Sequence, residues 1–181
     1  MYCTEWSIRG SCSLKVAKVD ENLAPTPIMR EFPRGMYTGR LDEKGRLKLP
    51  ADFHNHFRAL QEQKLFVTSL DRKTAAVYPL YKWREVEGFL DNYHEDPRAA
   101  LNVAFVAAEL GSEAEPDAQG RILFSQELRK ALGLEDQPLK LWARNGHVEV
   151  LSEETFNQRQ DESKQSPEQD LAKLRAAGLK C

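Results

Sequence analysis

The sequence is poor in cysteine and contains no long apolar segment. Its three cysteines, Cys3, Cys12 and Cys181, form no pair at a metal-ligand spacing, so free reduced thiols are expected. No stretch approaches the ~18 consecutive apolar residues of a membrane span. The N-terminal segment has no continuous apolar core, so no secretory signal is expected. These features favour a cytoplasmic protein without membrane partners.

The sequence also lacks an excess of charge of either sign. Its 26 Lys and Arg residues are balanced by 28 Asp and Glu residues, which gives a formal net charge of −2. This balance argues against a protein coated in nucleic acid, but it permits a local basic patch, because phosphate contacts need only a few cations on one face. A chain of 181 residues can form one domain or two small units that share a core.

A turn motif that occurs twice is the most informative feature present. "LDEKGRLKLP" (41–50) and "PDAQGRILFS" (116–125) both contain Asp-x-x-Gly-Arg followed by alternating apolar residues. In each case the aspartate suits the first position of a type I turn and the glycine suits the fourth. We expect the strands on either side of each turn to pair as a hairpin.

The same order of elements follows each turn. A helix, a hairpin and a second helix are predicted in both halves, and Asn145-Gly146 is a strong two-residue turn signal in the second hairpin. In the first half the predicted elements are strands 36–41 and 46–50, helix 51–60, strands 64–70 and 74–80, and helix 81–90. In the second half they are strands 112–116 and 121–124, helix 125–133, strands 138–143 and 147–151, and a helix from 152. This order indicates an internal duplication.

The duplication divides the chain into five expected segments. Neither repeat has enough apolar residues to fold alone, so a shared core and an α+β fold are expected. The segments are a poorly ordered extension (1–31), a first repeat (32–95), a connector helix opened by Asp96 (96–111), a second repeat (112–160) and a charged tail (161–181).

The motifs resemble those of the MraZ family. The sequences D-x-K-G-R-L at 42–47 and D-x-Q-G-R-I at 117–122 are similar to the paired Asp-x-x-x-Arg motifs of that family, and "LFVTSLDRKTAAVYPLYKW" is similar to its middle segment. The resemblance covers residues 32 to 160. Pro116 and Ser125 depart from the pattern, where an apolar residue and a proline are usual. Because family chains usually begin near position 32, we expect translation to start at Met29.

The resemblance implies both a fold and a function. The fold is a swapped-hairpin β-barrel of two AbrB/SpoVT-type repeats with flanking helices. The function is that of a bacterial transcriptional regulator that assembles into homo-oligomeric rings and binds double-stranded DNA at short promoter repeats. Members act on the division and cell wall gene cluster and associate with the nucleoid.

Arg46 has the right chemistry for reading a base. A planar guanidinium can donate to guanine O6 and N7 together, and each such pair discriminates by about 1–3 kcal/mol. Asp42 lies four residues earlier and can hold the guanidinium in position. The same Asp–Arg pair also fits a purely structural role, in which it only closes the turn.

Charge counted along the sequence separates the two turns. The first carries Arg40, Lys44, Arg46 and Lys48 against two acids, and the second carries Arg121 against three, including Asp117 and Glu113. The count predicts that Arg46 contributes more to DNA binding than Arg121. The expected DNA-binding residues are Arg40, Asp42, Lys44, Arg46, Lys48, Asp117 and Arg121.

Other candidate sites are interpreted as structural. His54 and His56 are two positions apart on a helix and cannot share a metal ion, so surface histidines are expected. Trp83, Trp142 and Phe156 are expected to be packing residues. The sequence has no nucleophile elbow, phosphate loop or HExxH motif, so neither an enzyme, a cofactor nor a small-molecule substrate is expected.

A second functional hypothesis remains open. Single AbrB-type units also occur in antitoxins that bind a toxin. The tail from Asp161 has the character of a partner-binding segment, so the chain is alternatively a protein-interaction module.

Overall fold

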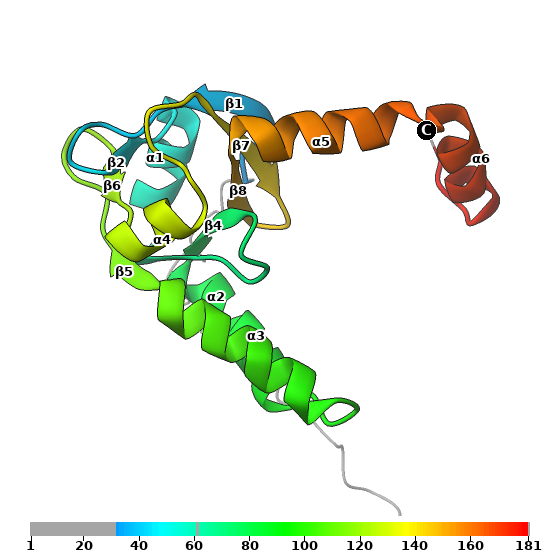
Figure 1. Ribbon diagram of the computed structural model, residues 1–181, viewed down its shortest axis with the longest axis horizontal. Helices are drawn as coiled ribbons and strands as arrows, with labels where there is room; N and C mark the ends of the chain where they lie inside the picture. Colours follow the sequence, from blue (N-terminus) through cyan, green and yellow to red (C-terminus); the bar gives the residue numbers. More distant parts are fainter. Residues whose placement is uncertain (1–31, 61, 181) are drawn as a thin grey trace, which may run out of the picture.

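The computed structural model describes residues 32–60 and 62–180, and within them eight strands and six helices form an α+β fold (Figure 1). All strand pairs are antiparallel. The expected N-terminal extension (1–31), with Met29, Cys3 and Cys12, lies outside the described residues, as does Cys181.

The observed elements follow the predicted order in both repeats. The first repeat contains β1 (Gly35–Gly39), β2 (Arg46–Lys48), α1 (Ala51–Arg58), β3 (Leu65–Thr68), β4 (Ala75–Pro79) and α2 (Leu80–Asp91). The helix α3 (Pro97–Leu110) leads to the second repeat, with β5 (Ser112–Ala114), β6 (Arg121–Leu123), α4 (Gln126–Ala131), β7 (Leu139–Arg144), β8 (His147–Leu151) and α5 (Glu153–Lys164), and α6 (Pro167–Ala176) follows.

The strand order shows that the two repeats exchange their first strands. The larger sheet has the order β1-β7-β8-β4-β3-β5, and the smaller sheet pairs β2 with β6. β1 of the first repeat therefore pairs with β7 of the second, and β5 of the second pairs with β3 of the first. When each strand is replaced by its counterpart in the other repeat, both sheets keep the same strand order, read from the opposite edge. A pseudo-two-fold axis therefore passes between β4 and β8 and between β2 and β6.

The expectation of a local hairpin around each repeated turn was wrong. A single bridge between Leu41 and Leu47 joins the segments that flank the first turn. The flanking strands pair across the repeats because Leu47 and Ile122 then lie side by side, fully buried. Local hairpins would satisfy the same alternating pattern but would leave each repeat to cover its own apolar face.

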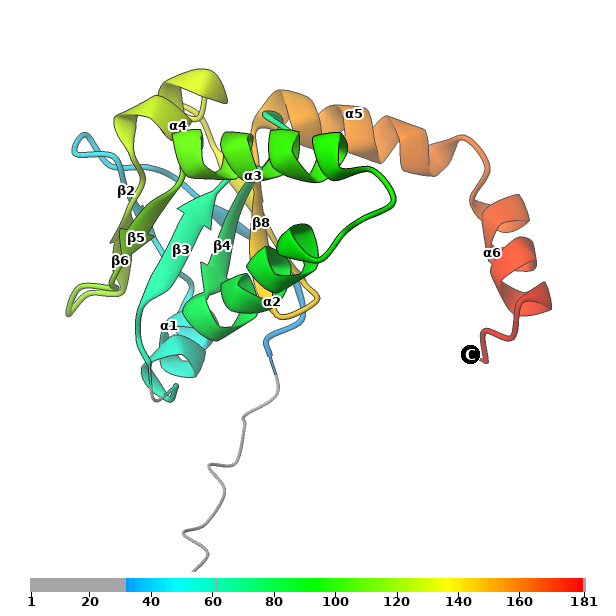
Figure 2. The same ribbon diagram turned by 90° about the horizontal axis from the view of Figure 1, so that it is seen from below.

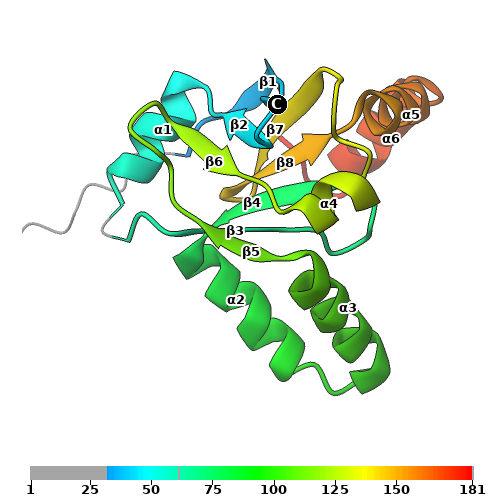
Figure 3. The same ribbon diagram turned by 60° about the vertical axis from the view of Figure 1, so that its left-hand side comes forward.

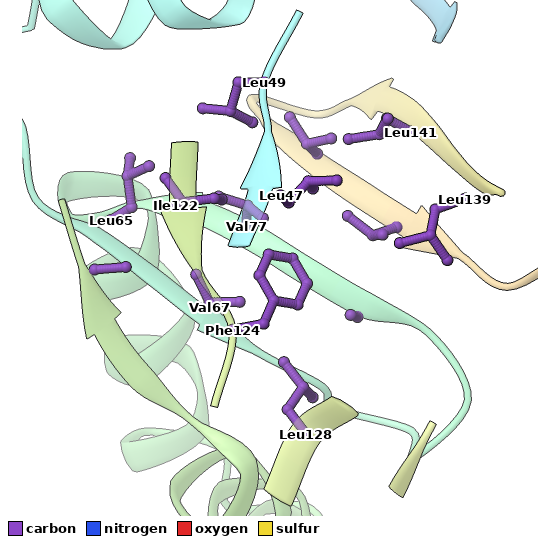
Figure 4. Close-up of a cluster of buried hydrophobic side chains, with 14 of the residues drawn as sticks. Leu47, Leu49, Leu65, Val67, Val77, Ile122, Phe124, Leu128, Leu139 and Leu141 are labelled. Atoms are coloured by element: carbon purple, nitrogen blue, oxygen red, sulfur yellow. The ribbon is translucent and has the colours of Figure 1, made fainter. Parts of the chain in front are cut away.

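The expected shared core is present. Figure 4 shows Leu47, Ile122 and Phe124 from the two turn regions pointing toward residues of the larger sheet. The fully buried side chains from the first repeat include Phe53, Phe57, Leu65 and Val77, and those from the second include Leu128, Leu139, Leu141 and Val148.

Local sequence signals produced the expected caps and turns. The Asp96 side chain accepts a hydrogen bond from the Ala99 backbone N–H (3.0 Å) at the start of α3. Ser125 accepts one from Leu128 N–H (3.2 Å) and caps α4, which explains why serine suits the position of Pro50 in the first repeat. Asn145 and Gly146 both have positive φ, as a two-residue hairpin turn requires.

The expectation of two surface histidines was wrong for His56. Its side chain is 7% exposed and contacts the Phe32 ring edge-on, with centroids 5.1 Å apart. The helical period explains the burial, because His56 follows the buried Phe53 by three positions and shares its face of α1. His54 lies on another face and is half-buried.

The aromatic residues that were expected to pack differ in depth. Trp83 is buried and stacks on Phe66, with centroids 4.4 Å apart. Trp142 and Phe156 are half-buried at the base of α5, where the Arg144 guanidinium lies 5.1 Å from the Trp142 ring.

The last two helices project away from the sheets (Figures 1 and 2). α5 continues through position 160, so the boundary expected there falls inside a helix. α6 has no buried residue, and Leu171 and Leu174 are exposed. In the described part of the chain no helix combines the length and apolar character needed to cross a membrane.

Candidate nucleic-acid interface

The first repeated turn is closed by the side chain of Asp42. Its Oδ1 accepts hydrogen bonds from the backbone N–H groups of Lys44 (3.0 Å) and Arg46 (2.9 Å). Its Oδ2 accepts from Arg46 Nε (2.8 Å) and lies 2.7 Å from Nη2. The carboxylate therefore fixes the turn with one oxygen and the guanidinium with the other.

The second turn repeats this network. Asp117 Oδ1 accepts from the backbone N–H groups of Gln119 (2.9 Å) and Arg121 (3.0 Å), and Oδ2 lies 2.7 Å from both Nε and Nη2 of Arg121. Gly45 and Gly120 have φ of 74° and 73°, a region that side-chain-bearing residues rarely adopt. The expected Asp–Arg contact thus exists in both repeats with the same geometry.

Both aspartates are held in the ionised form. The hydrogen bond from the Arg121 side chain, followed by that from its backbone N–H, lowers the pKa of Asp117 to about 2. The corresponding bonds from Arg46 lower the pKa of Asp42. A guanidinium has five N–H donors. The aspartate engages Nε and one hydrogen of Nη2, so it leaves Nη1 and the second hydrogen of Nη2 unused.

The two arginines lie on one face of the β2–β6 ribbon. In its register Arg46 is opposite Leu123, and Lys48 is opposite Arg121. The central pair, Leu47 and Ile122, is completely buried, so the alternation of a strand directs the other four side chains outward. Residues 75 positions apart in the sequence thereby form one surface with three cations.

Contacts between the repeats hold the ribbon and its turns. Leu49 N–H donates to Gly120 O (2.9 Å), and Phe124 N–H donates to Gly45 O (3.0 Å). Arg129 of α4 covers Gly45, and His54 of α1 covers Gly120.

Sequence reasoning missed the roles of Arg129 and His54 at the turns. The two residues are separated by the repeat offset of 75, the same offset that separates Asp42 from Asp117. This relation is the signal by which they were detectable.

The other expected site residues surround the first turn. Lys44 and Lys48 are exposed, while Arg40 Nη2 donates to the Asp136 carbonyl oxygen (3.4 Å). An open hollow of about 880 Å³ lies beside Arg40 and Lys44. Its charged lining residues are Arg40, Asp42, Glu43, Lys44, Arg46, Arg129, Glu135 and Asp136.

The fold redistributes the charges that were counted along the sequence. Lys48, assigned to the first turn, faces Arg121 of the second. Glu113, assigned to the second turn, lies on the larger sheet and pairs with Lys64 (Nζ to Oε2, 3.4 Å). The charges counted along the sequence therefore do not correspond to the charges that surround Arg46 and Arg121 in the fold.

Within residues 32–60 and 62–180, no three His, Cys, Asp or Glu side chains gather in an arrangement suited to a metal ion.

These features define a duplicated α+β protein in which two repeats exchange strands and present a basic two-stranded ribbon. The chain belongs to the MraZ family, because it is 34% identical over 139 residues to the transcriptional regulator MraZ of Acidobacterium capsulatum, a match that covers 77% of this chain and 94% of the relative. It is 34% identical over 125 residues to the protein of the same name from Thermomicrobium roseum, which covers 67% of this chain and 82% of the relative. The corresponding protein of Koribacter versatilis is 35% identical over 99 residues, 54% of this chain and 67% of the relative. No protein-family model matches the chain.

Proposed function

We propose that this chain is a transcriptional regulator that binds specific sequences in double-stranded DNA through the outward face of its β2–β6 ribbon. The observation that carries the proposal is the register of that ribbon. The register brings Arg46, Lys48 and Arg121 together. In addition, an aspartate of each turn contacts the arginine that follows it.

The ribbon has a suitable size and chemistry for the major groove. The groove is about 12 Å wide and admits a two-stranded ribbon, as known ribbon-type DNA-binding proteins illustrate. The arginine edge left by the aspartate matches the O6 and N7 acceptors of guanine. Lys48 and the exposed Lys44 supply phosphate contacts, which position the protein without reading sequence.

We further propose that the two sheets form the swapped-hairpin barrel of two AbrB/SpoVT-type repeats, covering residues 32–95 and 112–160. The exchange of β1 and β5 between the repeats supports this assignment. In simpler relatives with one such repeat, two subunits would supply what one chain supplies here.

A single chain is a weak DNA-binding unit, since its net charge is −2 and its basic surface is one short ribbon. We therefore propose that the active form is a homo-oligomeric ring. Aligned copies of the ribbon would bind short repeated elements in the promoter of the division and cell wall gene cluster, in the cytoplasm and in association with the nucleoid. This role requires no cofactor and no catalytic residue.

A protein-interaction function is the second candidate. The helices α2 and α3 pack side by side (Figure 3) and expose Phe89, Leu101 and Phe105, which are between 64% and 69% exposed. The α6 helix exposes Leu171 and Leu174. Such apolar surfaces are suited to contacts with another chain, whether a second copy or an unrelated partner.

Titration of the protein with the DNA upstream of its own coding sequence distinguishes the two candidates. We expect a salt-dependent shift of this fragment, with affinity falling linearly on a logarithmic scale as salt rises. A scrambled fragment of equal length is the control. A stable complex with a protein partner, formed without any preference for the upstream fragment, would favour the second candidate.

A further inference from the structure

Leu123 is a large apolar side chain on an otherwise basic face. It is 55% exposed at the end of β6, directly opposite Arg46. A single exposed leucine is ordinary on most of a protein surface. Here Leu123 shares the outward face of the β2–β6 ribbon, whose two strands are three residues long, with Arg46, Lys48 and Arg121. A DNA duplex bound by the three cations would also meet Leu123.

The pseudo-two-fold axis relates Leu123 to Lys48. Both follow their turn arginine by two positions and point outward from equivalent strands. The ribbon therefore has unequal halves, in which Arg46 has an apolar residue opposite and Arg121 has a cation opposite.

From this juxtaposition we infer that Leu123 is a specificity-determining residue that contacts the 5-methyl group of a thymine, an inference that rests on the proposed DNA-binding function. The thymine methyl is the apolar group that base pairs present in the major groove. Residues directly opposite on antiparallel strands have Cβ atoms about 4.5–5.5 Å apart. Because base pairs are spaced by about 3.4 Å, the thymine lies one or two base pairs from the guanine bound by Arg46.

The unequal halves also predict a directional target. Lys48 occupies the position equivalent to Leu123 and presents an ammonium group, which suits a guanine or a phosphate rather than a methyl group. The ribbon thus prefers an element with thymine at one end over a palindrome, although its backbone is pseudo-symmetric.

Replacing thymine by uracil tests the inference, because uracil lacks only the methyl group. The probe is the double-stranded fragment upstream of this chain's own coding sequence, prepared with thymine or with uracil throughout. The full chain should bind the uracil fragment about fourfold more weakly for each thymine methyl group that Leu123 buries. Leu123→Ala should bind both fragments equally, and Leu123→Met, which remains apolar, should retain a preference for thymine.

Lys48→Ala is the matched control, because it alters the equivalent position of the other strand. This variant should bind both fragments more weakly but keep the wild-type ratio between them. A thymine preference that persists in Leu123→Ala, or is absent from the wild type, would overturn the inference while leaving the DNA-binding function intact. A wild-type chain that binds neither fragment would overturn both.

Discussion

Replacing Asp42 by asparagine should weaken sequence-specific DNA binding, although it removes a negative charge from the proposed DNA-contacting surface. The carboxylate accepts two backbone hydrogen bonds through Oδ1 and contacts the Arg46 guanidinium through Oδ2. An asparagine amide oxygen can still accept the backbone bonds, but its NH₂ group has no acceptor for a guanidinium. The turn is preserved while Arg46 loses its orientation.

The two physical effects of Asp42→Asn have opposite signs. An oriented arginine–guanine contact is worth about 1–3 kcal/mol, so its loss should reduce affinity for the specific sequence about 5- to 150-fold. Electrostatics acts in the other direction, because the net charge changes from −2 to −1 and every phosphate is attracted more strongly. The ratio of specific to non-specific affinity should therefore fall more than the specific affinity itself.

Competition fluorescence anisotropy measures both affinities. A labelled upstream fragment is displaced by its unlabelled form or by a scrambled fragment, at two salt concentrations. Glu43→Gln is the matched control, because Glu43 is the exposed neighbour of Asp42 and undergoes the same change in charge. If both variants gain affinity equally for both fragments, Asp42 only closes the turn and does not orient Arg46.

The turns and the proposed ring give three further predictions. Gly45→Ala should destabilise the fold by about 1–3 kcal/mol, because φ at Gly45 is 74° and an added Cβ would lie 2.5 Å from the Arg129 guanidinium. Thermal melting measures this loss, and Gly88→Ala is the control, because a Cβ added at Gly88 would contact nothing within 4 Å. In the folded state the pKa of Asp117 is lowered to about 2. Its interaction with Arg121 therefore stabilises the fold fully above the unfolded-state pKa, and this stabilisation is lost as the pH falls through about 2. Asp117→Asn should therefore flatten the pH dependence of the urea midpoint between about pH 4 and pH 2. Three promoter elements in series should bind about 10²–10⁴-fold more tightly than one isolated element, and equal affinities would argue against a ring.

Local structure was predictable from the sequence because its causes are local. Asp96 followed by Pro97 defines a helix start, and Asn145-Gly146 supplies the two positive φ angles of a tight hairpin. The Asp42–Arg46 contact was equally accessible, since four residues of a type I turn bring the two side chains together.

The pairing of strands was not predictable in the same way. β2 alternates one buried residue between two outward ones, and this pattern fits a local hairpin as well as a partner 75 positions away. The choice depends on which arrangement buries Leu47 and Ile122 in one core. The position of Lys48 opposite Arg121 depends on that choice, so the charge around each turn could not be obtained from sequence neighbours.

Parallel measurement of Arg46→Ala and Arg121→Ala tests most directly whether both repeats contribute to one DNA-contacting ribbon. The count along the sequence favours Arg46, whereas the ribbon requires both arginines. With oligomeric state matched by light scattering, both variants should lose affinity for the upstream fragment by similar factors of about 5- to 150-fold. Arg98→Ala, an exposed arginine on α3, should bind as the wild type does. A large loss from Arg46→Ala with none from Arg121→Ala would contradict a shared ribbon.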